Sequence, residues 1–169
     1  MPTPTPLERV PPRPEPQRLP RALPERGLYV VDGSWGTLQP IQLAAGVRTV
    51  GELEVIEQIR RGRPLVDTRV AASHAEATLP TAVNIPRREV VARIAELATD
   101  MATVFFCNGP QCAATPASIR ALLEAGHPPE LIRYYRGGMH DWITLGLPVA
   151  GRRSRPQDSS SERPVIASG

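Results

Sequence analysis

Two cysteines, Cys107 and Cys112, are the only thiols of this 169-residue chain. Cys107 follows the apolar run Thr103–Phe106, and an Asn-Gly-Pro turn comes directly after it. A short run of β-branched and aromatic residues is typical of a buried strand, and Asn-Gly-Pro ends a strand abruptly. We therefore predict that Cys107 is the last residue of a core strand and that a tight loop presents its sulfur.

Helix-forming signals follow this loop. Thr115 suits the N-cap, Pro116 suits the first helical position, and Gly126 closes a segment with apolar residues at helical spacing: Ile119, Leu122 and Leu123. A strand, a tight loop and a helix start would surround Cys107 with backbone N–H groups. Loop amides and the positive end of a helix dipole stabilise an anion, either a thiolate or the oxyanion of a substrate. The spacing is therefore that of a site for a nucleophilic sulfur.

The composition is that of a globular chain long enough for one domain with a sizeable core. Its net charge of +3 comes from arginine, since lysine is absent, and part of it lies in the two termini. We interpret this charge as a feature that keeps the protein soluble, and we expect no nucleic-acid partner.

No apolar run could span a bilayer or form a signal peptide, so we predict a cytoplasmic protein without a membrane partner. In that reducing compartment we expect free thiols, and three scattered histidines offer no zinc spacing, so no metal is expected.

Both ends of the chain differ in composition from its middle. Residues 1–26 hold nine prolines and no apolar periodicity, and residues 151–169 are low in apolar content, so we predict a disordered tail at each end. Residues 27–47 contain two extended candidates whose pairing would form a β-hairpin extension: 28–31 and 37–43. The main domain is assigned to residues 48–150.

Strand and helix patterns alternate along the main domain. Strands are predicted at 64–69, 82–85, 103–106 and 131–135. Helices are predicted after a capping box at 49–52, at 74–79, 87–97, 115–126 and 139–145, with Leu53, Ile56 and Ile59 inward in the first and Val90, Val91, Ile94 and Leu97 inward in the third. This alternation favours a parallel sheet covered on both faces. Ligands of such sheets bind at the carboxyl ends of strands, where Asp67, Cys107 and Arg136 fall.

Four segments, taken in order, resemble the rhodanese-like family. They are an apolar strand ending in Asp-x-Arg at 65–69, a segment from His74 through Thr78-Leu79-Pro80 to Asn84-Ile85-Pro86, the strand 104–107 ending in cysteine, and a Gly-Gly turn followed by Trp142. The resemblance covers about residues 48–150. It implies a three-layer α/β/α fold with a five-stranded parallel sheet, a cysteine that carries sulfane sulfur as a persulfide, and no cofactor.

The loop after Cys107 departs from the family pattern. Its residues are Asn108, Gly109, Pro110, Gln111, Cys112 and Ala113, and none of them is basic. Phosphatase chemistry of the Cys-x5-Arg type needs a guanidinium for a tetrahedral oxyanion, but Ala113 stands at that position. Thiosulfate, a dianion, would have to rely on backbone N–H groups and on arginines outside the loop: Arg69, Arg120 or Arg136.

These observations lead to the hypothesis of a two-step sulfurtransferase. Cys107 would attack a small sulfur donor, and the resulting persulfide would pass its sulfur to cyanide, to a thiol or to a protein acceptor. Asp67 and Arg69 would be a framework pair that orients the loop, or else a buried salt bridge with no contact to the reaction. Arg136 would support the same site.

Several alternatives remain open from the sequence. Cys112 could resolve the persulfide or protect Cys107 from over-oxidation, line the substrate site, or be a small buried loop residue. The whole domain could be a non-catalytic module that binds proteins, or a redox sensor that uses both cysteines. A catalytic or sensing Cys107 is expected to react with a lowered pKa.

Overall fold

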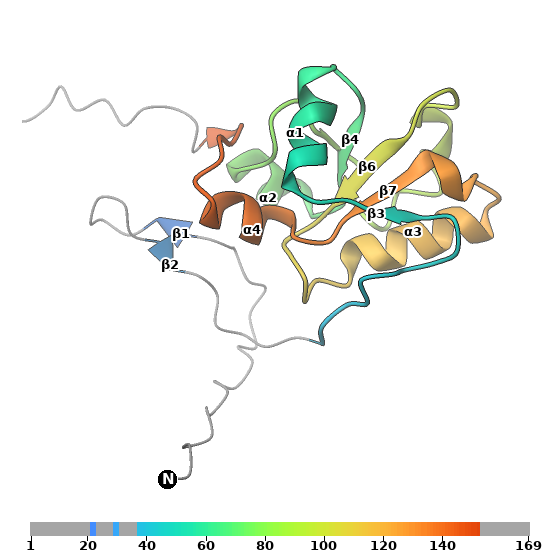
Figure 1. Ribbon diagram of the computed structural model, residues 1–169, viewed down its shortest axis with the longest axis horizontal. Helices are drawn as coiled ribbons and strands as arrows, with labels where there is room; N and C mark the ends of the chain where they lie inside the picture. The colour runs from blue at the N-terminus through green and yellow to red at the C-terminus, as the bar shows by residue number, and fades with distance from the viewer. Residues whose placement is uncertain (1–20, 23–28, 31–36, 153–169) are drawn as a thin grey trace, which may run out of the picture.

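The computed structural model describes residues 21–22, 29–30 and 37–152. Its main feature is a five-stranded, all-parallel sheet in the order β3-β7-β6-β4-β5 (Figure 1). The strands are β3 (Arg48–Thr49), β4 (Leu65–Asp67), β5 (Val83–Asn84), β6 (Thr103–Phe106) and β7 (Ile132–Tyr135). β6 lies between β7 and β4, so the carboxyl end of β6 has a neighbouring strand end on each side. The predicted five-stranded parallel sheet is confirmed.

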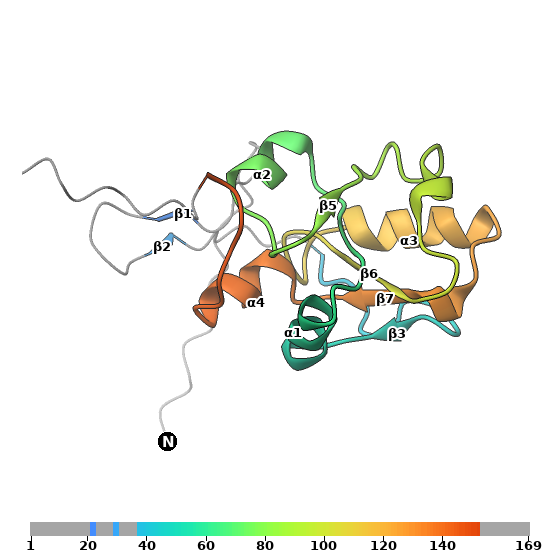
Figure 2. The same cartoon turned by 90° about the horizontal axis from the view of Figure 1, so that it is seen from above.

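Helices cover both faces of this sheet (Figure 2). They are α1 (Glu52–Arg60), α2 (Ala71–Glu76), α3 (Ala114–Glu124) and α4 (Gly138–Thr144), with single 3-10 turns at η1 (Ile94–Glu96) and η2 (Pro129–Leu131). α3 packs on one face, whereas α1 and α4 pack on the other. The architecture is therefore the expected three-layer α/β/α arrangement. Within the described part of the chain, no helix is long and apolar enough to cross a membrane.

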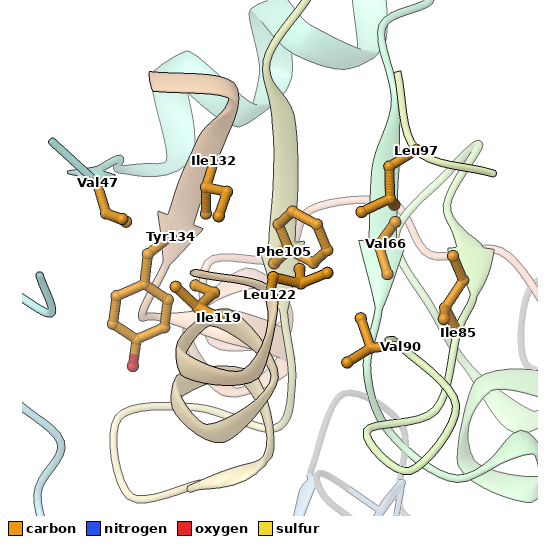
Figure 3. Close-up of a cluster of buried hydrophobic side chains, with 10 residues drawn as sticks. All are labelled: Val47, Val66, Ile85, Val90, Leu97, Phe105, Ile119, Leu122, Ile132 and Tyr134. Atoms are coloured by element: carbon orange, nitrogen blue, oxygen red, sulfur yellow. The ribbon is translucent and has the colours of Figure 1, made fainter. Parts of the chain in front are cut away.

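Alternate side chains of β6 enter two separate hydrophobic clusters. Phe105 lies in the cluster that contains Ile119 and Leu122 of α3 (Figure 3). Phe106 points to the other face and joins the cluster of Trp142 on α4. Burying each such side chain contributes roughly 1.5–3 kcal/mol. The strand that carries the cysteine loop is thus held from both sides of the sheet.

α1 begins two residues later than the sequence predicts. Gly51 is its N-cap, and the Gly51 N–H donates to Glu54 Oε2 at 2.7 Å, so the capping box is shifted. The buried face of the helix holds Val55 and Gln58, whereas Leu53 in the first turn is 83% exposed. The Gln58 amide is satisfied inside, because its Nε2 donates to the Ala102 carbonyl at 2.8 Å. The prediction that Leu53 faces the core is wrong, whereas Ile56 and Ile59 do pack against it.

The segment predicted as a helix at 87–97 consists of turns that end in η1. Val90 and Leu97 are buried as expected, but Val91 is 44% exposed. Two adjacent β-branched residues have weak helix propensity. Arg93 also donates to the Asn84 carbonyl at 3.1 Å, which holds the turns against the end of β5. Apolar spacing identified most of the buried residues here but not their backbone conformation.

The N-terminal extension is not the predicted hairpin. β2 (Tyr29–Val30) pairs antiparallel with β1 (Arg21–Ala22), which lies in the segment predicted to be disordered, and residues 37–43 form no strand. The remaining residues of the 1–26 tail and most of the 151–169 tail lie outside the described residues. The two-residue strand β3 was not predicted, because it is too short to leave a pattern. At the other end, an antiparallel bridge between Thr78 and Ala150 closes the domain.

Candidate active site

The loop between β6 and α3, residues 107–113, is called the cysteine loop below. Cys107 comes directly after β6 and is only 2% exposed. The first amides of α4 hold the loop from the opposite side, because Met139 N–H donates to the Cys107 carbonyl at 3.0 Å and His140 N–H to the Asn108 carbonyl at 2.8 Å. The loop is therefore fixed by backbone bonds to an element about thirty residues further along the chain.

The Gly-Gly turn before α4 allows the cysteine loop to lie close to the start of this helix. Gly138 has φ +57°, and a Cβ atom at this position would lie 2.4 Å from the Cys107 carbonyl oxygen and 2.8 Å from the Gly109 nitrogen. Such contacts cannot be relieved by a rotamer change, because both partners are backbone atoms. The sequence predicts a tight turn here, and the structure shows that the loop leaves no room for a side chain.

Thr115 is inside α3 rather than at its N-cap. The N-cap is Ala113, which makes no side-chain capping bond. Thr115 is fully buried, and its hydroxyl lies 2.8 Å from the hydroxyl of Thr68, which in turn donates to the Phe106 carbonyl at 3.0 Å. The Thr115 hydroxyl and N–H both face the Cys107 sulfur. The contact of Thr115 with Cys107 and Thr68 leaves no local signal in the sequence, because Thr68 and Thr115 are far apart in the chain.

The two cysteines of the loop are direct neighbours. A turn closed by the Cys112 N–H and the Gly109 carbonyl, 2.9 Å apart, folds the chain back on itself. As a result, the Cys107 Sγ donates to the Cys112 carbonyl oxygen at 3.5 Å, and the two thiols are close enough to shift each other's pKa. Cys107 is buried, whereas Cys112 is partly exposed, and both are free thiols. The tight loop is confirmed, and it brings the second thiol to the first.

These two thiols have pKa values that move in opposite directions. Burial raises the pKa of Cys107 well above 9.0, and the adjacent Cys112 raises it further, although Thr115 acts the other way. The hydrogen bond from Cys107 lowers the pKa of Cys112 to about 6, against the effect of burial, with help from the Ala114 and Asn108 amides. The pKa of Cys107 is thus raised rather than lowered as expected for a catalytic thiol, and the loop amides favour the thiolate form of Cys112.

Asp67 and Arg69 form the predicted pair behind the cysteine loop. Arg69 Nη2 lies 2.6 Å from Asp67 Oδ2 and Arg69 Nε lies 3.0 Å from Oδ1, with Asp67 fully buried. Arg69 also donates to the Ala77 carbonyl at 2.6 Å and approaches Asn108 Oδ1 at 3.4 Å. His74 and Thr78 complete the set around the carboxylate. The pair thus contacts the cysteine loop at Asn108.

The charge of Asp67 is stabilised within this set of partners. Burial alone would raise its pKa, but the hydrogen bonds from His74 and Arg69, together with the guanidinium charge, lower it below 3.8. The positive charge of Arg69 also helps to lower the pKa of Cys112. The electrostatic effect of this pair therefore reaches the cysteine loop without a direct contact to Cys107.

Arg136 was predicted to support the site, and its side chain contacts the segment that precedes β3. Its Nε donates to the Gln39 carbonyl at 2.8 Å, and the Gln39 N–H donates to the Pro110 carbonyl at 2.8 Å. Arg136 therefore reaches the cysteine loop through residues 37–43, the segment that was predicted to be a hairpin strand. Of the other loop residues, Gln111 is partly buried and Ala113 is exposed.

The arrangement suits sulfur chemistry at the N-terminus of α3. Two thiols lie side by side, the pKa of Cys112 is lowered and that of Cys107 is raised, and N–H groups of Thr115, Ala114 and Asn108 face the sulfurs. An anion formed on either sulfur is stabilised there without a basic side chain in the loop. Among residues 37–152, no group of three or more His, Cys, Asp or Glu side chains could hold a metal ion.

The profile of the Rhodanese-like domain family matches residues 52–145, which include β4 to β7, the cysteine loop and α4. This match covers more than half of the 169 residues. The chain therefore belongs to the rhodanese-like domain family. The family resemblance of the four sequence segments is confirmed.

Solved structures that share the fold include a sulfur-transferring enzyme. The thiosulfate sulfurtransferase of Pseudomonas aeruginosa is similar with a TM-score of 0.54 and 23% identity, over 68% of this chain and 22% of that one. The rhodanese-like domain of an Anabaena sp. protein has a TM-score of 0.53 and 18% identity, over 71% of this chain and 92% of that one. At these identities the likeness concerns the fold.

A relative among characterised sequences has a regulatory name. It is the HTH-type transcriptional regulator Rv0324 of Mycobacterium tuberculosis, 35% identical over 85 residues. The match covers 50% of this chain and 36% of the regulator, so this chain spans about a third of that relative's length.

Proposed function

We propose that this chain is a sulfurtransferase that carries sulfane sulfur as a persulfide on Cys107. The observation that carries the proposal is the position of the Cys107 sulfur at the end of the central strand, facing the N–H and hydroxyl of Thr115 at the start of α3. Membership of the rhodanese-like family supports it. The reactants would be a small sulfur donor and a thiol or cyanide acceptor, and the compartment a reducing cytoplasm.

The loading step begins with a proton transfer from the Cys107 thiol to the Cys112 thiolate. Cys112 thiolate takes the proton from Cys107 as the Cys107 sulfur attacks the sulfane sulfur of thiosulfate. One sulfur–sulfur bond forms on Cys107, the sulfur–sulfur bond of thiosulfate breaks, and sulfite leaves with both electrons of that bond. The product is a Cys107 persulfide anion beside a protonated Cys112. Cys112 thus acts as a local base, which explains how a thiol with a raised pKa can react.

The discharge step regenerates the enzyme. Cyanide attacks the outer sulfur of the persulfide and leaves as thiocyanate, and the Cys107 thiolate is released. A thiol acceptor would take the outer sulfur in the same way and become a persulfide itself. The N–H and hydroxyl of Thr115 face the Cys107 sulfur and would stabilise its negative charge as it returns.

Intact-protein mass spectrometry tests this proposal. The reduced full chain is incubated with thiosulfate, and the expected result is a gain of one sulfur that dithiothreitol removes. Cys107→Ser should show no gain, whereas the parent protein should also produce thiocyanate from cyanide at a rate at least about a thousand-fold higher than this variant. An unchanged rate in Cys107→Ser, or no adduct on the parent from thiosulfate and from glutathione persulfide, would overturn the proposal.

A second candidate is a thiol-based sensing module. It is favoured by the regulator among the relatives and by the pair of adjacent thiols at one loop. Such a module would change its thiol state without turnover. Multiple-turnover thiocyanate production separates the two candidates, because a sensor would be modified once by the donor and would not consume further donor and cyanide.

A further inference from the structure

Cys112 is placed to react with whatever Cys107 carries. The turn closed by Gly109 brings the Cys112 carbonyl oxygen within 3.5 Å of the Cys107 sulfur, and the two thiols are close enough to shift each other's pKa. A disulfide needs its two Cβ atoms within about 3.5–4.5 Å of each other. Because the turn already folds Cys112 back onto the Cys107 sulfur, a small movement of the loop can bring the pair into that geometry.

The difference in solvent exposure between the two cysteines also favours a reaction between Cys107 and Cys112. Cys107 is 2% exposed, so an outside thiol has little access to the inner sulfur of a persulfide on this residue. Cys112 is partly exposed and lies at the same helix N-terminus, where the Ala114 and Asn108 amides face its sulfur. The group best placed to attack the inner sulfur therefore belongs to the chain itself.

We infer that Cys112 is a resolving thiol, which discharges the Cys107 persulfide as hydrosulfide and leaves a Cys107–Cys112 disulfide. This inference rests on the proposed sulfur carriage by Cys107. It assigns the release of sulfide, in addition to sulfur transfer, to the same site. The bridge is a transient state of the reaction cycle, and both residues are free thiols in the structure.

The step balances without an outside oxidant. The Cys112 thiol gives its proton to the outer sulfur of the persulfide anion, and the Cys112 sulfur forms a bond to the Cys107 sulfur. The bond between the Cys107 sulfur and the outer sulfur breaks, and hydrosulfide leaves with that electron pair. The sulfane sulfur is reduced to sulfide, and the two cysteine sulfurs are oxidised to the disulfide.

The resulting disulfide defines the class of co-substrate that completes the cycle. Two electrons and two protons must return to the cysteines before a new donor can bind. A dithiol supplies both through a mixed disulfide followed by its own ring closure. The second substrate of this site is therefore a thiol reductant that brings two electrons, such as a dithiol, and cyanide would compete with resolution for the same persulfide.

A single-turnover experiment tests the inference. The reduced full chain is loaded with thiosulfate to a constant mass, excess donor is removed, and sulfide is measured over time without added reductant. Both cysteines fall in one tryptic peptide, residues 94–120, which reports the outcome by mass. In the parent protein this peptide should first gain one sulfur and then lose that sulfur and two hydrogens, with one sulfide released for each chain.

Matched variants separate this inference from the proposed function. Cys112→Ser and Cys112→Ala lack the base of the loading step, so they are loaded to a constant mass at higher pH and then compared with the parent at one pH. They should retain the added sulfur on Cys107 and release sulfide at least about ten-fold more slowly, because no intramolecular attack is available. Equal rates of sulfide release in the parent and both variants, with no disulfide, would overturn the resolving role and leave sulfur carriage intact. No adduct in any of the three proteins would overturn both proposals.

Discussion

Two polar clusters lie at the carboxyl edge of the sheet, and they differ in how they hold charge. Asp67 and Arg69 neutralise each other in a buried ion pair, with further bonds to His74, Thr78 and the Ala77 carbonyl. In the cysteine loop, two thiols that face backbone amides have pKa values shifted in opposite directions, with that of Cys112 lowered and that of Cys107 raised. The first cluster holds its charges with fixed partners, whereas under the proposed function the second moves a proton.

This difference separates a framework from a reaction site. Burial of Asp67 is offset by fixed partners, so its ionised form changes little during any step. Burial of Cys107 is offset only in part, which leaves its reactivity dependent on Cys112. Changes in the ion-pair cluster should therefore affect stability first, and changes in the cysteine loop should affect reactivity first. Four predictions test this distinction.

The largest effect is expected on stability for Asp67→Asn. The change keeps the size of the side chain but leaves the buried Arg69 guanidinium without its counter-charge, which should cost about 3 kcal/mol of unfolding free energy. Chemical denaturation of the parent and the variant measures this difference. Because the folded-state pKa of Asp67 is lowered below 3.8, the stabilisation is present above that pH and is lost as the pH falls through the folded-state value.

The deficit of Asp67→Asn should therefore shrink under strongly acidic conditions. Glu57→Gln is a suitable control, since its exposed ion pair with Arg61 on α1 should contribute little. A deficit as small as that of the control would show that the Asp67 cluster is not the framework described above.

The next effect is expected on reactivity for Thr115→Val. This substitution keeps the shape of the side chain but removes the hydroxyl that faces the Cys107 sulfur and lowers its pKa. A hydrogen bond to a charged group contributes about 1.5–3 kcal/mol, so persulfide formation with thiosulfate should slow about ten-fold or more. The rate of persulfide formation is measured by mass spectrometry on samples quenched at successive times.

Two variants accompany this measurement. Thr115→Ser should retain the rate, whereas Thr68→Val removes only the hydroxyl that bonds Thr115 and should have a smaller effect. If Thr115→Val loads sulfur as fast as the parent but melts at a lower temperature, Thr115 belongs to the framework.

The pH dependence of loading is expected to follow the shared thiolate. Below pH 6 both sulfurs are protonated, and above it the pair carries one negative charge, because the pKa of Cys112 is lowered to about 6. The second-order rate with thiosulfate should therefore rise about ten-fold between about pH 5 and pH 7. In Cys112→Ser the rise should move to higher pH, since burial raises the pKa of Cys107. A parent profile that rises only above pH 8 would contradict the sharing of a proton between the thiols.

The smallest effect is expected for Arg136→Met. The Arg136 side chain donates to the Gln39 carbonyl, so its loss should loosen residues 37–43 and change the thiosulfate KM less than about three-fold. Steady-state kinetics with thiosulfate and with glutathione persulfide measure this change. A KM that rises more than ten-fold for thiosulfate alone would instead make Arg136 a binding group for the dianion.

The parts of the site that the sequence predicts are local ones. The strand 103–106, the tight turn after Cys107 and the Asp67–Arg69 pair each depend on neighbouring residues, and each is present. The helix after the loop is also present, although it starts two residues earlier than predicted. Apolar runs and turn residues report the backbone directly, which is why the cysteine loop could be located without coordinates.

The parts that were missed depend on contacts between distant segments. The Thr68 and Thr115 hydroxyls are 47 residues apart in sequence, and Arg136 and Gln39 are 97 apart. Neither contact leaves a periodic signal, because each joins one residue to a single residue of a distant segment. The raised pKa of Cys107 and the lowered pKa of Cys112 also depend on how deeply each sulfur is buried. A sequence pattern predicts the burial of a strand or a helix face but not that of a single loop side chain.

The close packing of Gly138 against the cysteine loop has a consequence for how such a domain can diversify. Since the Cys107 carbonyl and the Gly109 nitrogen occupy the space where a side chain at position 138 would be, the loop cannot change its path independently of the turn before α4. Insertions or deletions in one segment would require a compensating change in the other. New donor preferences are therefore more accessible through side-chain replacement at the exposed Ala113 than through remodelling of the loop backbone.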